Sequence, residues 1–180
     1  YYPISTLMLA GIRDIMIISN PDDVDNFKKV LKDGSQLGVN FEYAIQEEPK
    51  GIAQSFLIAE DYIKNDDVAL ILGDNVYHGS NFSNKLKRAK REVSRENKTI
   101  LFGYQVHDPN RYGVVEFDEN RQVISVEEKP ETPKSNFCIT GLYFCPKGVS
   151  IKAKKVQPSA RGELEIVSLI DQYVNEGLLD

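Results

Sequence analysis

Apolar residues in the first half of the chain recur with two spacings, one typical of helices and the other of buried strands. Continuous apolar runs at residues 15–18 and 68–72 indicate strands that are covered on both faces, as in a parallel sheet. Apolar residues at every second position over 39–45 predict a third strand, and residues 99–106 predict a fourth. Helical spacing predicts helices near residues 4–10, 20–33, 52–63 and 82–93. This alternation predicts a mostly parallel sheet that helices cover.

The pattern changes after residue 106, where turn-forming clusters of Asp, Asn and Pro separate short apolar strands. Strands are predicted at residues 114–117, 123–127 and 139–144, and this spacing favours hairpins in an antiparallel, β-rich insertion. A last amphipathic helix is predicted over residues 163–176. Because the chain has no internal repeat and no linker-like stretch, the sequence predicts one α/β domain that carries this insertion.

The composition of the 180 residues, with 41% hydrophobic and 27% charged positions, is typical of a folded globular domain. No apolar run approaches the roughly 18 residues that cross a bilayer, which argues against a membrane protein. Two cysteines, Cys138 and Cys145, cannot form a disulfide framework, so we expect buried thiols and a reducing, cytoplasmic location. Since His78 and His107 are the only histidines, a zinc site is not expected.

A net charge of −5 argues against a dedicated nucleic-acid-binding protein. One predicted helix is rich in basic residues, but its apolar stripe places them on the solvated side; they are Lys85, Lys87, Arg88, Lys90, Arg91 and Arg95. We therefore expect small-molecule substrates rather than nucleic acid or a membrane.

The strongest candidate for chemistry is the segment Leu72-Gly73-Asp74-Asn75, at the end of the strand predicted over 68–72. Ligands of open α/β sheets bind beyond the carboxyl ends of the strands. A carboxylate at this position could hold Mg²⁺ against the phosphates of a substrate. Gly-Asp-Asn is equally suited to an ordinary turn. These residues alone leave the metal ligand and the turn open with equal weight.

Three further polar clusters could bind a substrate, although ordinary surface roles fit each of them at least as well. In the loop 46–54, Gln46 could recognise the edge of a base and Gly51 could let the backbone approach a flat ligand. Glu128 and Lys129 lie at a strand end and could bind the hydroxyls and the phosphate of a sugar phosphate. Arg161 precedes the last predicted helix, where it could contact a phosphate.

The order of motifs along the chain resembles the sugar-phosphate nucleotidylyltransferases. Single motifs are weak, but the ordered set is specific and covers most of the chain; the matching segments are 1–14, 33–39, 46–54, 72–75, 108–117, 127–130, 140–144 and 158–166. The resemblance implies a Rossmann-like nucleotidyltransferase sheet, a homotetramer, Mg²⁺ as cofactor and a metal-binding role for Asp74. It also implies transfer of a thymidylyl group from dTTP to glucose 1-phosphate. The products would be dTDP-glucose and pyrophosphate, in a first step of dTDP-L-rhamnose synthesis.

The resemblance further implies a role for each matching position. Asp74 is similar to one of two aspartates that bind Mg²⁺, and Asn75 is similar to a residue that contacts the sugar. Gln46 and Gly51 resemble the pair that recognises thymine. The remaining positions resemble residues around the sugar and its phosphate: Tyr112 and Gly113 beside the ribose and hexose, Glu128 at the hydroxyls, Lys129 and Arg161 at the phosphate, and Ile139 through its backbone. Asp74, Lys129 and Arg161 are therefore the expected catalytic residues.

Two elements of the family pattern do not occur within residues 1–180, namely the glycine-rich triphosphate loop and the second metal-binding aspartate. We therefore expect an internal segment of a longer protein, with a single domain incomplete at both ends and inactive alone. Residues 1–106 would bind the nucleotide and residues 107–180 the sugar phosphate. Two alternatives stay open: a pyrophosphorylase of the same fold that uses another nucleoside triphosphate, and a catalytically silent module that binds or senses nucleotide sugars.

Overall fold

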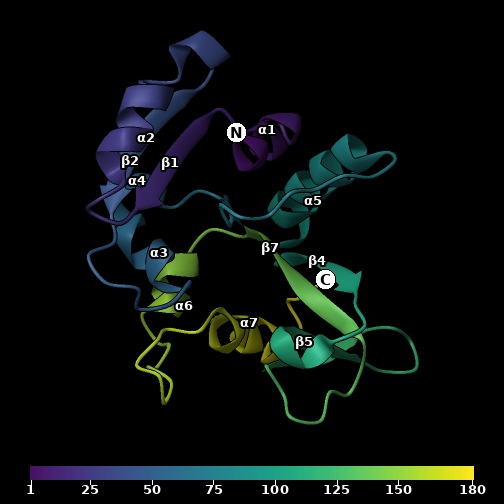
Figure 1. Cartoon of the computed structure of the whole chain (residues 1–180). Helices are drawn as coiled ribbons and strands as arrows, with labels where there is room; N and C mark the ends of the chain where they lie inside the picture. The colour runs from purple at the N-terminus through teal and green to yellow at the C-terminus, as the bar shows by residue number, and fades with distance from the viewer.

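The computed structural model describes all 180 residues, and its first half alternates helices and strands (Figure 1). In chain order these elements are α1 (Tyr2–Leu9), β1 (Asp14–Ser19), α2 (Val24–Leu31), η1 (Ser35–Leu37), β2 (Asn40–Ile45), α3 (Gln54–Ile58), α4 (Glu60–Ile63) and β3 (Val68–Ile71). Helix α1 ends where the sequence predicts, because Gly11 adopts a left-handed φ of 77° directly after the Ala10 cap.

The second half contains a long helix, several short strands and two helices near the end of the chain. These elements are α5 (Phe82–Glu96), β4 (Ile100–Gln105), η2 (Pro109–Arg111), β5 (Gly113–Phe117), β6 (Val123–Glu128), β7 (Phe137–Cys145), α6 (Val149–Ala153) and α7 (Ile166–Asn175). Helix α5 buries Leu86, Ala89 and Val93 and exposes its basic side chains, as the apolar stripe predicts. The three short strands expected after residue 106 are confirmed.

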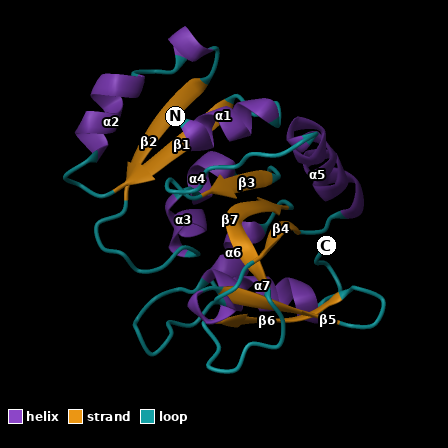
Figure 2. Ribbon diagram, turned by 45° about the vertical axis from the view of Figure 1, so that its right-hand side comes forward, coloured by secondary structure: helices purple, strands orange, loops and turns teal.

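The strands form two sheets, one parallel and one antiparallel (Figure 2). β1 and β2 pair in parallel over their whole length, from Asp14 opposite Asn40 to Ser19 opposite Ile45. The second sheet has the order β3-β7-β5-β6, with β4 also paired to β7, and all its pairs are antiparallel. The mixed α/β class is thus confirmed, and parallel pairing is confined to β1 and β2 apart from an isolated parallel bridge between Thr99 and Leu179.

Three clusters of buried apolar side chains form the core. The largest has 16 buried residues, Phe56 and Tyr173 among them, and joins α3, α6 and α7 to the antiparallel sheet. A second cluster joins α5 to β7 through Leu86 and Leu142, and a third joins α1 and α2 to the parallel sheet. Both cysteines are buried and free, as expected. The helices therefore cover the sheets and leave the strand ends to carry polar groups.

Two helices of the first half differ from expectation. The helix expected over 52–63 consists of α3 and α4, which meet at Ala59, where a ψ of 6° departs from helical geometry. Helix α2 begins at Val24 instead of Asn20. Residues 20–23 form a turn, in which the Asp23 N–H donates to Asn20 Oδ1 at 2.8 Å.

Two helices near the end of the chain also differ. Helix α7 begins at Ile166 instead of residue 163, because Glu165 is extended with ψ of 137° and the backbone of Leu164 pairs with another loop. That pairing takes both backbone groups of Leu164 and prevents an earlier helical turn. The five-residue helix α6 has no counterpart among the expected elements.

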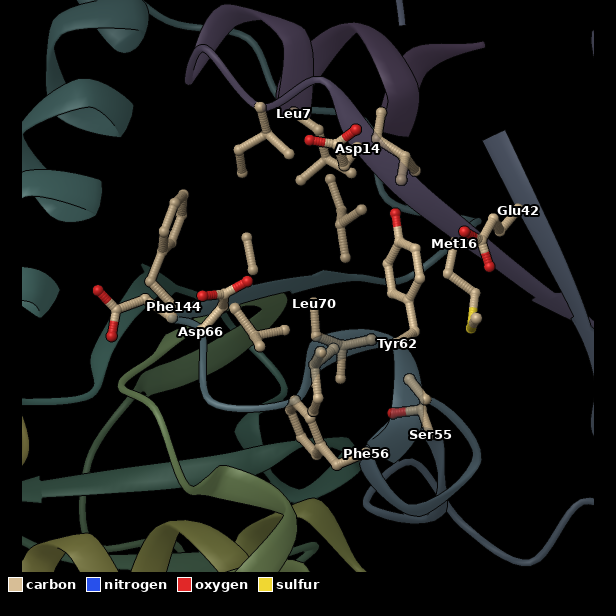
Figure 3. A pocket seen from close by; sticks show the side chains of 18 of the residues that line it. Leu7, Asp14, Met16, Glu42, Ser55, Phe56, Tyr62, Asp66, Leu70 and Phe144 are labelled. Atoms are coloured by element: carbon tan, nitrogen blue, oxygen red, sulfur yellow. The ribbon is translucent and has the colours of Figure 1, made fainter. Parts of the chain in front are cut away.

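A cavity of about 930 Å³ lies between β1 and β3 (Figure 3). β1 pairs with β2 alone and β3 with β7 alone, so each strand has one unpaired edge. The Tyr62 hydroxyl lies in this cavity without a hydrogen-bond partner. Burial, together with the carboxylates of Asp14 and Glu42, raises the pKa of Tyr62 to about 12. The rest of the lining is mainly apolar and includes Leu7, Met16, Phe56, Leu70 and Phe144.

Candidate substrate-binding site

Asp74 and Asn75 lie beyond the carboxyl end of β3, where the apolar strand gives way to a turn that the Asn75 N–H closes on Leu72 at 3.3 Å. The Asp74 carboxylate is exposed and accepts a hydrogen bond from Asn75 Nδ2 at 2.7 Å. Asn75 Oδ1 accepts two more, from the Gly141 N–H at 3.1 Å and from the Tyr77 hydroxyl at 3.2 Å. These contacts fix the orientation of the Asn75 amide and direct its Nδ2 towards Asp74.

Gly141, in the middle of β7, allows the turn after β3 to pack closely against that strand. A Cβ atom at Gly141 would lie 2.7 Å from the Leu72 side chain and 2.9 Å from Asn75 Nδ2. Backbone bonds add to this contact, since the Leu72 N–H donates to the Gly141 carbonyl at 2.8 Å. A glycine inside a strand often marks such a close approach. The position of the Asp74 turn therefore depends on strand β7.

The loop after β2 places the side chain of Gln46 against the start of α3. Gln46 Nε2 donates to Gln54 Oε1 at 2.7 Å and lies 3.4 Å from the Gly51 carbonyl. The Gln46 side chain is half-buried, so its amide has a defined position. Gly51, with φ of 96°, does face a close neighbour, but that neighbour is the backbone of Leu164, to which an added Cβ would come within 2.4 Å.

Strands β5 and β6 bring together the residues expected around the sugar. Gly113 is paired with Glu128, and the Lys129 N–H donates to the Tyr112 carbonyl at 2.9 Å. Ile139 of β7 packs on Gly113, since a Cβ there would lie 2.9 Å from the Ile139 side chain. These five positions, far apart in the sequence, thus line one end of the β5-β6 pair.

Glu128 lies between the two candidate phosphate ligands. Its Oε1 is 3.6 Å from Lys129 Nζ and 4.0 Å from Arg161 Nη2. Arg161 is held more firmly by Glu165, whose Oε1 accepts from Nη2 at 2.9 Å and also from the Ser159 hydroxyl at 2.7 Å. The hydrogen bond to Glu165 is the main reason why the pKa of Arg161 lies above its ordinary value. The two cations and Glu128 therefore form one charged group.

Apart from Gln46 and Gly51, which contact each other, the charged and amide residues expected at the site fall into two groups. Glu128, Lys129 and Arg161 belong to one, and Asp74 with Asn75 to the other, with no ion pair between Asp74 and either cation. Sequence reasoning missed three positions that hold these groups: Tyr77, Gly141 and Glu165. Of these, only Gly141, as a glycine within a strand, carried a usable sequence feature.

The cavity between β1 and β3 does not coincide with this site. None of the expected site residues lines the space between β1 and β3. The strand ends and loops described above concentrate the polar groups that can bind phosphate and sugar. We therefore place the candidate site there.

Polar loops and a carboxylate at the strand ends of an α/β domain are typical of proteins that bind nucleotides and other phosphorylated ligands. The chain matches the family described as nucleotidyl transferase over residues 1–180, and it belongs to that family.

Individual relatives agree with this assignment. A glucose-1-phosphate thymidylyltransferase of Neisseria meningitidis is 49% identical over 179 residues, which cover 99% of this chain and 61% of that relative. A solved Bacillus anthracis structure, described as a glucose-1-phosphate thymidylyltransferase in complex with sucrose, is 34% identical with a TM-score of 0.89; the match covers 99% of this chain and 71% of that one. A UDP-glucose pyrophosphorylase complexed with UDP-glucose, at 20% identity and a TM-score of 0.80, shares the fold over 97% of this chain and 74% of its own.

The chain thus spans 61% of the length of its Neisseria meningitidis relative. No helix of the structure has the length and apolar character needed to cross a membrane. The structure also contains no group of three or more His, Cys, Asp or Glu side chains placed to hold a metal ion.

Proposed function

We propose that the protein transfers a thymidylyl group from dTTP to glucose 1-phosphate, giving dTDP-glucose and pyrophosphate, as a first step towards dTDP-L-rhamnose. The observation that carries this proposal is 49% identity to a glucose-1-phosphate thymidylyltransferase over 99% of the chain. The adjacent Glu128, Lys129 and Arg161 add a group suited to an anionic sugar.

In the proposed reaction, a phosphate oxygen of glucose 1-phosphate attacks the α-phosphorus of dTTP in line, and the bond to pyrophosphate breaks. Reactions of this kind depend on positioning and charge neutralisation, so a protein nucleophile is not needed. Lys129 and Arg161 would hold the attacking phosphate in place of Glu128 Oε1, which now lies between them. Glu128 would then be free to accept hydrogen bonds from the sugar hydroxyls.

On the nucleotide side, Gln46 would select the base. Its Nε2 donates to Gln54 Oε1 and to the Gly51 carbonyl, which fixes the amide and leaves Oε1 to accept a hydrogen bond from the ring N–H of thymine. Asn75, Tyr112, Gly113 and Ile139 would line the sugar and ribose. In this proposal residues 1–106 form the nucleotide-binding part and residues 107–180 the sugar-phosphate-binding part of one domain.

The donor chemistry at Asp74 fits a magnesium ion. Mg²⁺ is usually held by one or two carboxylates together with substrate phosphates and water. The single exposed carboxylate of Asp74 could therefore serve as the protein ligand, with phosphates and water as the other ligands. When bound, the ion would neutralise charge on the phosphates. The hydrogen bond from Asn75 would keep the Asp74 carboxylate pointing in a constant direction.

Release of pyrophosphate by the full-length protein tests the proposal, with dTTP, glucose 1-phosphate and Mg²⁺ as reactants. We expect turnover that requires all three, with kcat/KM for dTTP at least about tenfold above that for UTP, CTP or ATP, a difference of about 1.4 kcal/mol. Equal use of UTP would favour a pyrophosphorylase of another specificity. Binding of dTDP-glucose without turnover would favour a silent module. Light scattering of the same protein tests the expected homotetramer.

A further inference from the structure

Two loops that the proposed function assigns to different substrates are joined by backbone hydrogen bonds. The Leu164 N–H donates to the Lys50 carbonyl at 2.7 Å, and the Ala53 N–H donates to the Leu164 carbonyl at 3.1 Å. Residues 50–53 belong to the candidate base-recognition loop, and Leu164 lies three residues beyond Arg161. We call this pair of hydrogen bonds the Lys50–Leu164 junction.

Gly51 is required for the junction. A Cβ atom built on Gly51 would lie 2.4 Å from the Leu164 carbonyl oxygen and 2.6 Å from the Leu164 nitrogen. Both atoms belong to the backbone, so no side-chain rotation could relieve the overlap. The φ of 96° at Gly51 adds a backbone conformation that other residues rarely adopt. An alanine at this position would therefore separate the two loops.

The junction is continuous with a candidate ligand residue on either side. On the nucleotide side, Gln46 Nε2 contacts the carbonyl of Gly51 itself at 3.4 Å. On the sugar-phosphate side, Glu165 directly follows Leu164 and holds Arg161 through a charged hydrogen bond of 2.9 Å. Contacts thus run from the candidate base ligand to the candidate phosphate ligand without interruption.

We infer that the Lys50–Leu164 junction couples the two substrate sites, so that binding at the base-recognition loop strengthens binding at Arg161, and the reverse. This inference rests on the proposed function, because that function assigns a substrate to each loop. When one ligand orders its loop, the shared backbone hydrogen bonds also order the other loop. The second ligand then binds with a smaller loss of conformational entropy. The coupling must be equal in both directions. Gly51 and Glu165 are positioning residues in this scheme.

Amide hydrogen exchange of the full-length protein tests the junction directly. The Ala53 and Leu164 amides should exchange slowly, and Gly51→Ala should accelerate both at least about tenfold. Gly38→Ala is the matched control, since Gly38 also has a positive φ, of 71°, but nothing lies within 4 Å of an added Cβ. It should leave both amides protected. Fast exchange of both amides in the parent chain would show that the junction does not persist and would overturn the inference.

Titration calorimetry of the full-length protein tests the coupling. The α,β-methylene analogue of dTTP, which cannot release pyrophosphate, should tighten glucose 1-phosphate binding at least about fivefold in the parent and in Gly38→Ala. In Gly51→Ala, measured at analogue concentrations that saturate this variant, the enhancement should fall below about twofold. Coupling that survives in Gly51→Ala, or independent binding in the parent, would refute the inference while leaving the proposed function intact. Failure of both ligands to bind to the parent protein would instead refute the proposed function, and the inference with it.

A second measurement needs no variant. With the parent protein, glucose 1-phosphate alone should slow exchange of the Ala53 amide, and the dTTP analogue alone should slow exchange of the Leu164 amide. Each ligand would then protect the loop that it does not touch, which a purely structural junction would not produce. Protection limited to each ligand's own loop would contradict the inference.

Discussion

Asp74 lies exposed beyond β3, and its carboxylate accepts a hydrogen bond from Asn75 alone. We expect Asp74→Asn in the full-length protein to lower kcat at least about a hundredfold, or about 2.7 kcal/mol in barrier terms, because an amide binds Mg²⁺ poorly. An amide oxygen still accepts the Asn75 hydrogen bond, so the melting temperature should stay within about 2 °C of the parent value. Activity within about threefold of the parent would contradict the metal role.

Lys129 and Arg161 share Glu128 as a partner, and both side chains are about half exposed. If Lys129 binds the sugar phosphate, Lys129→Ala should raise the KM for glucose 1-phosphate at least about tenfold and leave the KM for dTTP nearly unchanged. Initial rates at varied concentrations of each substrate separate the two effects. Lys155→Ala, at another exposed lysine, serves as the control for a lost surface charge. Equal changes in both KM values would argue against this assignment.

Among the elements, β7 contacts the turn after β3 closely at Gly141. Gly141→Ala should lower the melting temperature by about 3–10 °C, because the new Cβ would overlap Leu72 and Asn75, and overpacking costs about 1–3 kcal/mol. Gly103→Ala is the matched control in the adjacent strand β4, since the atom nearest to its added Cβ is 3.9 Å away. Thermal unfolding followed by circular dichroism measures both variants. Equal stability of the two would show that the turn tolerates displacement.

Much of this element structure follows from local pattern. The apolar runs predict β1 and β3, and the stripe Leu86, Ala89, Val93 predicts α5, because burial of one face depends on spacing alone. The late start of α7 could not be predicted, since it results from pairing of Leu164 with a loop distant in the sequence. For the same reason the antiparallel pairing of β3 with β7 lay beyond a pattern that suits a parallel sheet.

Some residues of the candidate site could likewise be predicted from the sequence, and others could not. Asp74, Glu128 and Lys129 could be proposed because each is a charged residue directly after a strand, where ligands of α/β sheets bind. Glu165 could not be proposed, because its role depends on tertiary contacts. Its Oε1 accepts hydrogen bonds from Arg161 and from the Ser159 hydroxyl. The sequence suggested that Gly51 lets the backbone approach a ligand, which stays a prediction; the contact of Gly51 with the Leu164 backbone could be found only in the structure. A glycine in a polar loop suggests that another group approaches the backbone closely, but the identity of that group depends on the fold.

For the whole molecule, the unpaired edges of β1 and β3 matter most. Neither strand contains the Lys or Pro that commonly protects a sheet edge, so we expect the 180-residue chain to self-associate as its concentration rises. Met16→Lys, in the lining of the cavity, should reduce this association, whereas Val30→Lys on the exposed side of α2 should not. Light scattering across a dilution series, with melting temperatures measured alongside, provides the test. A monomer at every concentration would contradict the expectation.

The same 180 residues, made alone, should show no measurable thymidylyl transfer. Preorganised donors around the reacting phosphorus usually make the largest contribution to catalysis, and neither the glycine-rich loop nor the second metal-binding aspartate that the resemblance implies lies within this sequence. Loss of such a loop and of one metal ligand together costs on the order of 5 kcal/mol or more, which is several thousandfold in rate. Pyrophosphate release from dTTP, glucose 1-phosphate and Mg²⁺ should therefore be detected with the full-length protein and not with residues 1–180. Comparable turnover from both would show that the residues described above suffice for catalysis.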